Sequence, residues 1–182
     1  MCLVSIASAI PVVNPGFETG DFTGWTGDTS GGDVTSFAAH SGSFGARFGT
    51  IFSLGFIAQD LVTLPGATYD LSFWLRNNTS AFPDFPTHFE ASWNGSVIST
   101  SVLDNAAAFP YTQFTFTGLL ATGSLTSLQF SFRHDPSFWD FDDVSVTLNT
   151  APPAVPEAFS TLWLALPLAG MWGFARLRRR EA

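Results

Sequence analysis

Hydrophobic and polar residues alternate along most of the chain between residues 12 and 149. An apolar residue occupies every second position in five clear runs, at 69–75, 88–93, 114–117, 128–133 and 143–148. A period of two is the spacing of a half-buried β-strand, and no stretch of this region has convincing helical periodicity. The pattern therefore predicts a body built from strands.

Short turn sequences separate these runs. Asn94-Gly95 stands between two of them and is typical of a tight hairpin, while Pro65-Gly66 and Gly118 mark further turns. Many short strands with such punctuation predict an all-β fold, an antiparallel β-sandwich of the jelly-roll type. The 20 Phe residues fit a core that is filled from two facing sheets.

The pattern changes after residue 149. Residues 150–156 form a Pro-rich linker, and residues 158–175 then run for 18 positions without a charge. As a helix this run would be about 27 Å long, close to the thickness of a bilayer's hydrocarbon core. It is apolar on all sides, so we expect a single C-terminal transmembrane helix rather than a helix buried in a soluble core. The basic residues after it orient the C-terminus to the cytoplasm; they are Arg176, Arg178, Arg179 and Arg180.

Residues 1–11 are interpreted as the remnant of a signal peptide. Ala7-Ser8-Ala9 matches the small residues of a signal cleavage site, but the apolar stretch before it is short and has no positive start. We therefore expect the true start to lie upstream of Met1. The alternative is a short apolar N-terminus that packs on the domain.

Charge divides the chain where the pattern does. Residues 1–156 hold three Arg, no Lys and 13 acidic residues, a net charge of −10, whereas residues 157–182 carry a net charge of +2. A body this acidic argues against nucleic acid as a partner, because phosphate backbones bind Lys and Arg. The single Cys excludes an internal disulfide, and the three His lack metal-ligand spacing.

The C-terminal segment, residues 157–182, carries the features of a sorting signal. Three features occur in order here. The first is the short motif Val155-Pro156-Glu157-Ala158, which begins two residues before this segment, and it is followed by the apolar run and then by the Arg cluster. This layout resembles the PEP-CTERM sorting tail of Gram-negative bacteria, also known as the ice-binding protein C-terminal domain, over about residues 153–180. Ala158 stands where the family has a second Pro. The resemblance implies export, anchoring in the inner membrane, and processing by exosortase, a membrane cysteine protease.

Four short motifs in the body occur in an order that is also familiar. They are NPGFETGDFTGW at 14–25, HSGSFGA at 40–46, LPGATYDLSF at 64–73 and FDDVSV at 141–146. Together they resemble galactose-binding-like jelly-roll modules, a family that includes carbohydrate-binding modules, and they cover most of residues 14–148. The resemblance implies a jelly-roll domain over residues 12–149 that binds carbohydrate.

Glu18 and Asp142 are the carboxylates that stand out. Asp142 shares the parity of the apolar residues after it, so we expect it to point inward, where a charge needs a partner or a metal; Asp143 has the outward parity. Jelly-roll modules of this type commonly hold a structural Ca²⁺ between their first and last strands. The resemblance therefore implies a calcium site at Glu18, Asp142 and Asp143, with carbonyl groups near residues 40–43. The alternative is that backbone N–H groups or Arg47 satisfy these carboxylates.

Aromatic side chains are the candidates for contact with a sugar, because the apolar face of a sugar can stack on a ring. Trp74 has the outward parity among inward neighbours, and Tyr111, Phe138 and Trp139 lie at loop or strand ends. For each of these four, packing beneath a loop is the alternative. Trp93 has the inward parity and is predicted to lie in the core.

No residue is assigned a catalytic role. A glycosidase pair must flank a sugar at about 5–9.5 Å, and the sequence does not give the separation of Glu18 and Asp142. We expect an exported, non-enzymatic protein of the cell surface or extracellular matrix that binds extracellular polysaccharide. A structural envelope or biofilm protein without a sugar ligand is the alternative, and a polysaccharide hydrolase is the third hypothesis.

Overall fold

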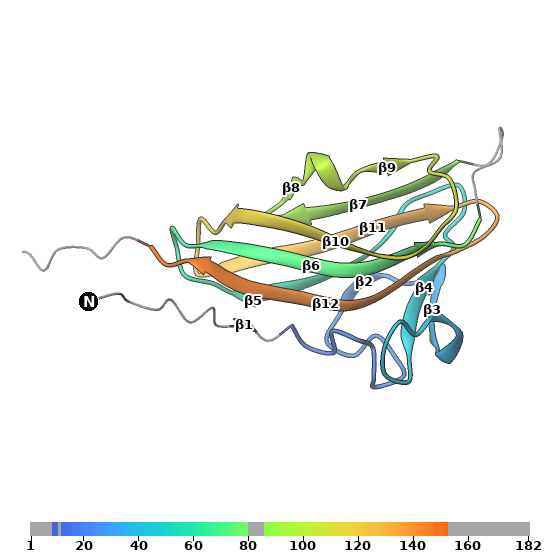
Figure 1. The fold of residues 1–182 in the computed structure, drawn as a ribbon, viewed down its shortest axis with the longest axis horizontal. Helices are drawn as coiled ribbons and strands as arrows, with labels where there is room; N and C mark the ends of the chain where they lie inside the picture. The colour runs from blue at the N-terminus through green and yellow to red at the C-terminus, as the bar shows by residue number, and fades with distance from the viewer. Residues whose placement is uncertain (1–8, 11, 80–85, 153–182) are drawn as a thin grey trace, which may run out of the picture.

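Two antiparallel sheets lie face to face in the computed structural model, which describes residues 9–10, 12–79 and 86–152. Figure 1 shows β6, β10 and β12 side by side in one layer, with β7 and β11 in the layer behind. The strands are β1 (Ala9–Ile10), β2 (Thr26–Asp28), β3 (Gly32–Thr35), β4 (Gly45–Phe48), β5 (Gly55–Val62), β6 (Thr68–Asn77), β7 (Thr87–Trp93), β8 (Ser96–Val97), β9 (Leu103–Asp104), β10 (Phe109–Leu120), β11 (Leu125–His134) and β12 (Trp139–Thr150). Two short 3-10 turns, η1 (Ser36–Ala38) and η2 (Ser99–Ser101), join them.

The strand order confirms the predicted all-β antiparallel sandwich. One sheet, here sheet A, has the order β10-β6-β12-β4-β3, with β1 paired to β12. The other, sheet B, has the order β2-β5-β11-β7-β8, with β9 paired to β7. Each of the five alternating runs lies within a strand, namely β6, β7, β10, β11 and β12.

The core between the sheets is dominated by phenylalanine. Phe73, Phe130 and Phe141 are fully buried, and the Phe130 and Phe141 ring centroids, which come from opposite sheets, are 4.6 Å apart. Trp93 is 5% exposed and donates its indole N–H to the Leu120 carbonyl, which confirms its predicted core position. Rings of this size bury large apolar areas, so these contacts hold the two sheets together.

A β-bulge in β12 changes which way its acidic residues face. Asp143 has a φ of +52°, and the register with β6 shifts between Asp142 and Ser145. Asp142 consequently lies opposite Trp74 on β6, and both side chains are on the outer face of sheet A. Val144 points into the core. The predicted inward direction of Asp142 is therefore wrong, because the extra residue resets the alternation.

Two of the predicted turns have different outcomes. Asn94 and Gly95, with φ of +53° and +76°, form the hairpin between β7 and β8 as predicted. Gly118, predicted as a turn, lies inside β10, where its φ of +73° accommodates a register shift against β6. It therefore bends a strand instead of ending one.

The two ends of the chain are described only in part. Residues 9–10, assigned by the sequence to a signal remnant, pair with Thr147 and Val146 of β12 as β1, which is the packing that the alternative interpretation describes. The predicted transmembrane helix at 158–175 and the Arg cluster lie outside the described residues. Within the ranges that are described, no helix is long and apolar enough to cross a membrane.

Candidate functional site

Asp142 anchors the segment that follows η1 to the outer face of sheet A. Its side chain is fully buried, and its Oδ2 accepts hydrogen bonds from the backbone N–H groups of His40 at 2.7 Å and Ser41 at 3.2 Å. Its Oδ1 accepts the N–H of Asp143 at 2.8 Å. Burial raises the pKa of Asp142 to about 6 despite these three donors. The strand β12 thus holds residues that are a hundred positions earlier in the chain.

Two further carboxylates secure the same segment. Asp143 accepts a hydrogen bond from the Ser41 hydroxyl at 2.7 Å and pairs with His40 Nδ1, also at 2.7 Å. Glu18 accepts the N–H groups of Ser43 and Phe44 at 3.0 and 3.1 Å. The structure therefore brings Glu18, Asp142 and Asp143 to one segment, residues 40–44.

The arrangement of these carboxylates fits the hydrogen-bonding alternative. The oxygens of Glu18 and Asp142 are directed at backbone N–H groups, which satisfy them without a cation. Arg47 takes no part, since its guanidinium lies 3.6 Å from Asp33. Within the residues that the structure describes, no group of three or more His, Cys, Asp or Glu side chains is placed to hold a metal ion. Calcium stays a prediction from the sequence.

Trp74 and Tyr111 pack against the anchored segment. The Trp74 indole stacks on the His40 imidazole with ring centroids 3.9 Å apart, and the Tyr111 ring meets His40 edge-on at 5.0 Å. The Tyr111 hydroxyl donates to the Ala38 carbonyl. Burial and the nearby carboxylate of Asp140 raise the pKa of the Tyr111 hydroxyl, so it stays a donor. These two rings support a loop, as the packing alternative predicts.

The other two candidate aromatics are engaged as well. Trp139 is fully buried and donates its indole N–H to the Arg133 carbonyl, so its ring has no free face for a sugar. This removes Trp139 from the candidate contact residues. Phe138 is half-buried, and the Arg47 guanidinium lies 4.0 Å from its ring centroid. The candidates chosen from the sequence therefore form no open aromatic platform.

A second set of polar side chains lines the outer face of sheet B. The strand register places Asp104 of β9 opposite His88 of β7, and His88 opposite Arg133 of β11. The next row brings Glu90, Ser131 and Phe56 together. Because alternate residues of a strand share one face, all these side chains point away from the core.

A hollow of about 390 Å³ lies at the end of this face, where β7, β9 and β11 meet the start of β5. His88 Nδ1 is 2.6 Å from Asp104 Oδ1, and His88 Nε2 is 3.3 Å from Glu90 Oε2. Arg133 donates to Asp135 Oδ2 at 2.8 Å. The hollow thus combines hydrogen-bonding groups with apolar surface, and it is lined by Ser53, Leu54, Pro86, Thr87, His88, Asp104, Asn105 and Arg133.

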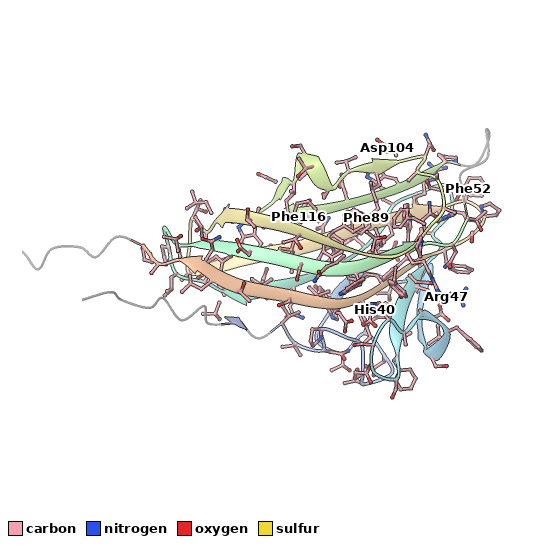
Figure 2. The ribbon with its side chains drawn as sticks, viewed as in Figure 1. His40, Arg47, Phe52, Phe89, Asp104 and Phe116 are labelled. Carbon is pink, nitrogen blue, oxygen red and sulfur yellow. The ribbon has the colours of Figure 1, made fainter. Side chains whose placement is uncertain are left out.

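An exposed aromatic ring is the immediate chain neighbour of two residues that line this hollow. Phe52 precedes Ser53 and Leu54 of the lining, is 82% exposed, and has a φ of +64°. Figure 2 shows it projecting from one end of the sandwich. A bulky residue rarely adopts a positive φ, and an exposed ring gains nothing from packing. Neither local preference nor core packing explains this residue, which makes it a candidate for ligand contact.

Part of this second site is visible in the sequence and part is not. His88 and Glu90 occupy the polar positions of the predicted strand at 88–93, so their outward direction follows from the alternation. Their neighbours Asp104 and Arg133 come from strands whose pairing the alternation does not specify. Phe52 lies in a loop with no pattern at all, and only the structure shows that its ring is exposed.

Comparison with known proteins supports the fold. No family model matches the sequence, and no curated protein matches it. Among solved structures, TmCBM61 in complex with β-1,4-galactotriose aligns with a TM-score of 0.58 at 19% identity, over 78% of this chain and 100% of that one. The CBM22-1–GH10 modules of xylanase 10B from Clostridium thermocellum, complexed with xylohexaose, align at 0.55 and 18% identity, over 77% of this chain and 29% of that one.

A different kind of protein shares the same architecture. The cyclase Fisc from Fischerella sp. TAU aligns with a TM-score of 0.57 at 18% identity, over 80% of this chain and 100% of that one. At these identities the comparisons establish a jelly-roll sandwich of the kind found in carbohydrate-binding modules. Function depends on the site that each chain builds on that fold.

Proposed function

We propose that this chain is a non-catalytic polysaccharide-binding protein whose ligand lies on the outer face of sheet B. The observation that carries the proposal is the hollow at His88, Asp104 and Arg133 beside the exposed ring of Phe52. Sugar sites combine an apolar surface for the sugar ring with a few fixed hydrogen-bonding groups. The solved structures named above include two that were determined with oligosaccharides, which is consistent with this use of the fold.

The charges around the hollow favour a neutral polysaccharide. Arg133 is already paired with Asp135, and His88 lies between Asp104 and Glu90. A uronate would have to displace one of these carboxylates and approach a chain of net charge −8. Neutral hydroxyl groups can instead share the carboxylate and guanidinium groups without any such cost.

The carboxylates considered for hydrolysis do not suit catalysis. Asp142 is fully buried, and Glu18 and Asp142 both accept hydrogen bonds from the backbone. A general acid or nucleophile must reach the glycosidic bond, and these oxygens are committed to holding residues 40–44. The contacts of Glu18 and Asp142 thus weigh against hydrolysis at these two residues.

Retention on immobilised polysaccharide tests the proposal. We expect the full chain to be retarded in native gels that contain xylan or β-1,4-galactan and to migrate freely in gels that contain polygalacturonate. Bovine serum albumin run in the same gels controls for sieving. Free migration of the chain in every neutral polysaccharide would instead favour the structural envelope or biofilm protein that binds no sugar.

The proposal includes the route by which the chain reaches its ligand. The sorting tail predicted at residues 157–182 would anchor the chain in the inner membrane until an exosortase-like protease cuts near Pro156-Glu157-Ala158, leaving the body at the cell surface or in the matrix. This part rests on the sequence resemblance and on the acidic, Lys-free composition of the body. Fractionation of cells followed by C-terminal sequencing of the mature protein tests it, and an intact Arg cluster in extracellular protein would contradict it.

A further inference from the structure

β10 is the longest strand at the edge of either sheet. Its only strand partner within the described ranges is β6, so every second residue directs its N–H and C=O groups away from the sheet. β10 has 12 residues, whereas the edge strands β2, β3 and β8 have three, four and two. β9, which also pairs only with β7, has two. β10 therefore offers an extended template for a further strand.

The same strand lacks the charges that usually protect an edge. Residues 105–132 contain no Asp, Glu, Arg, Lys or His. The edge strands β2, β3 and β9 carry Asp28, Asp33 and Asp104. Natural sheets place charges, Pro or bulges at edges to prevent pairing with other chains. β10 has Pro110 and one register shift near its start, and Gly118 and a second register shift near its end. Between them, Thr112 to Phe116 pair regularly with β6 and carry none of these protective features.

The distribution of charge indicates which partner fits this edge. The chain carries a net charge of −8, so two copies repel each other over most of their surfaces. The uncharged β10 is a strip along which two copies can approach. Antiparallel pairing of one strand with its own copy is self-complementary, as a two-fold interface requires. With the axis at Thr115, Gln113 faces Thr117 on the outer side, and the half-buried Phe114 and Phe116 cover each other on the inner side.

We propose that two copies of this chain pair through β10 in antiparallel orientation and join their A sheets into one continuous sheet. The inference does not depend on polysaccharide binding, because the hollow lies on the outer face of sheet B. It predicts a homodimer in which Thr115 of each copy lies opposite its counterpart.

Disulfide trapping with a matched control tests this arrangement. In a Cys2→Ser background of the full chain, Thr115→Cys is compared with Ser145→Cys under the same mild oxidation. Thr115, Ser72 and Ser145 occupy one row across sheet A, so both introduced thiols face the same side, but Ser145 lies on the interior strand β12. Opposed residues of antiparallel strands are close enough for a disulfide. We expect a covalent dimer from Thr115→Cys and none from Ser145→Cys.

Sedimentation equilibrium supplies a second readout. We expect the native chain to have twice its monomer mass of 19.6 kDa at micromolar concentration. Thr115→Glu, which would place two carboxylates opposite each other, is expected to be monomeric, whereas Ser145→Glu remains dimeric. Equal circular dichroism spectra and melting temperatures of the variants confirm that the fold is retained. A monomeric native chain would overturn the proposal. Equal disulfide trapping of Thr115→Cys and Ser145→Cys, together with equal association of Thr115→Glu and Ser145→Glu, would overturn it as well.

Discussion

At the scale of single residues, the carboxylate of Asp142 links two parts of the chain that are far apart in sequence. Three backbone N–H groups converge on it, and it has no exposed surface. Buried donors that lose their acceptor retain the full cost of desolvation. The side chain is thus more important for holding the segment at 40–44 than for any chemistry of its own.

Replacing Asp142 tests this role directly. We expect Asp142→Ala to lower the free energy of unfolding by about 3 kcal/mol, because three N–H donors lose their acceptor. Asp142→Asn, which keeps one acceptor oxygen, should lose less. Urea unfolding followed by tryptophan fluorescence measures both. A loss for Asp142→Ala no greater than that for Asp142→Asn would show that the N–H contacts contribute little.

His134 is a buried histidine whose contacts specify one tautomer. Its Nε2 lies 2.7 Å from the Asn77 side-chain oxygen and 3.1 Å from the Thr79 carbonyl, so it donates, while its Nδ1 accepts the Ser137 N–H at 3.3 Å. Burial lowers the pKa of His134, and a proton on Nδ1 would break the bond to Ser137. The folded protein therefore holds the neutral form.

The pH dependence of stability follows from this shift. The unfolded chain binds a proton at His134 near pH 6.5, before the folded state does, so the stabilisation is present above that pH and declines below it. We expect the difference in unfolding free energy between the native chain and His134→Gln to shrink from pH 7 to pH 5. Asp142 titrates in both proteins, and its contribution cancels in the comparison. A difference that stays constant over this range would contradict the assignment.

At the scale of elements, the alternation of apolar and polar residues was sufficient to predict five strands. It was insufficient to predict side-chain direction past a bulge, or a strand that has a polar residue at an inward position. The bulge at Asp143 reverses the parity of Asp142, and the sequence gives no sign of it beyond an unusual acidic pair. Gln59 occupies an inward position of β5. Its burial is compensated because its side-chain amide donates to the Val13 and Gly24 carbonyls. A polar residue at that inward position interrupts the alternation, so the alternation does not predict this strand.

The hairpin between β7 and β8 gives a clean test of turn geometry. Gly95 has a φ of +76° and no atom within 4 Å of an added Cβ, so Gly95→Ala introduces backbone strain and nothing else. We expect it to lower the melting temperature in line with a loss of about 1 kcal/mol. The matched control is Gly123→Ala, where φ is not positive and an added Cβ meets only ordinary contacts at 3.5 Å. Equal effects of the two substitutions would show that φ at Gly95 does not matter.

At the scale of the whole molecule, the sandwich presents two different outer faces. The outer face of sheet A is covered at one end by the segment that Asp142 and Trp74 hold, and its edge β10 is the proposed dimer contact. The outer face of sheet B carries the polar rows and the hollow. The fold class could be predicted from periodicity alone. The row of Asp104, His88 and Arg133 could not, because it depends on pairing between strands distant in sequence.

The most direct measurement for the central claim compares two exposed phenylalanines in different parts of the sandwich. Phe52 lies beside the hollow, and Phe37, which is 81% exposed, belongs to η1 on the side of sheet A. Isothermal titration of the full chain with xylohexaose and with β-1,4-galactotriose should show binding to at least one of them. We expect Phe52→Ala to weaken that binding about tenfold, or about 1.4 kcal/mol, and Phe37→Ala to leave it unchanged. Undiminished binding by Phe52→Ala, or loss in Phe37→Ala alone, would place the sugar elsewhere and contradict the account.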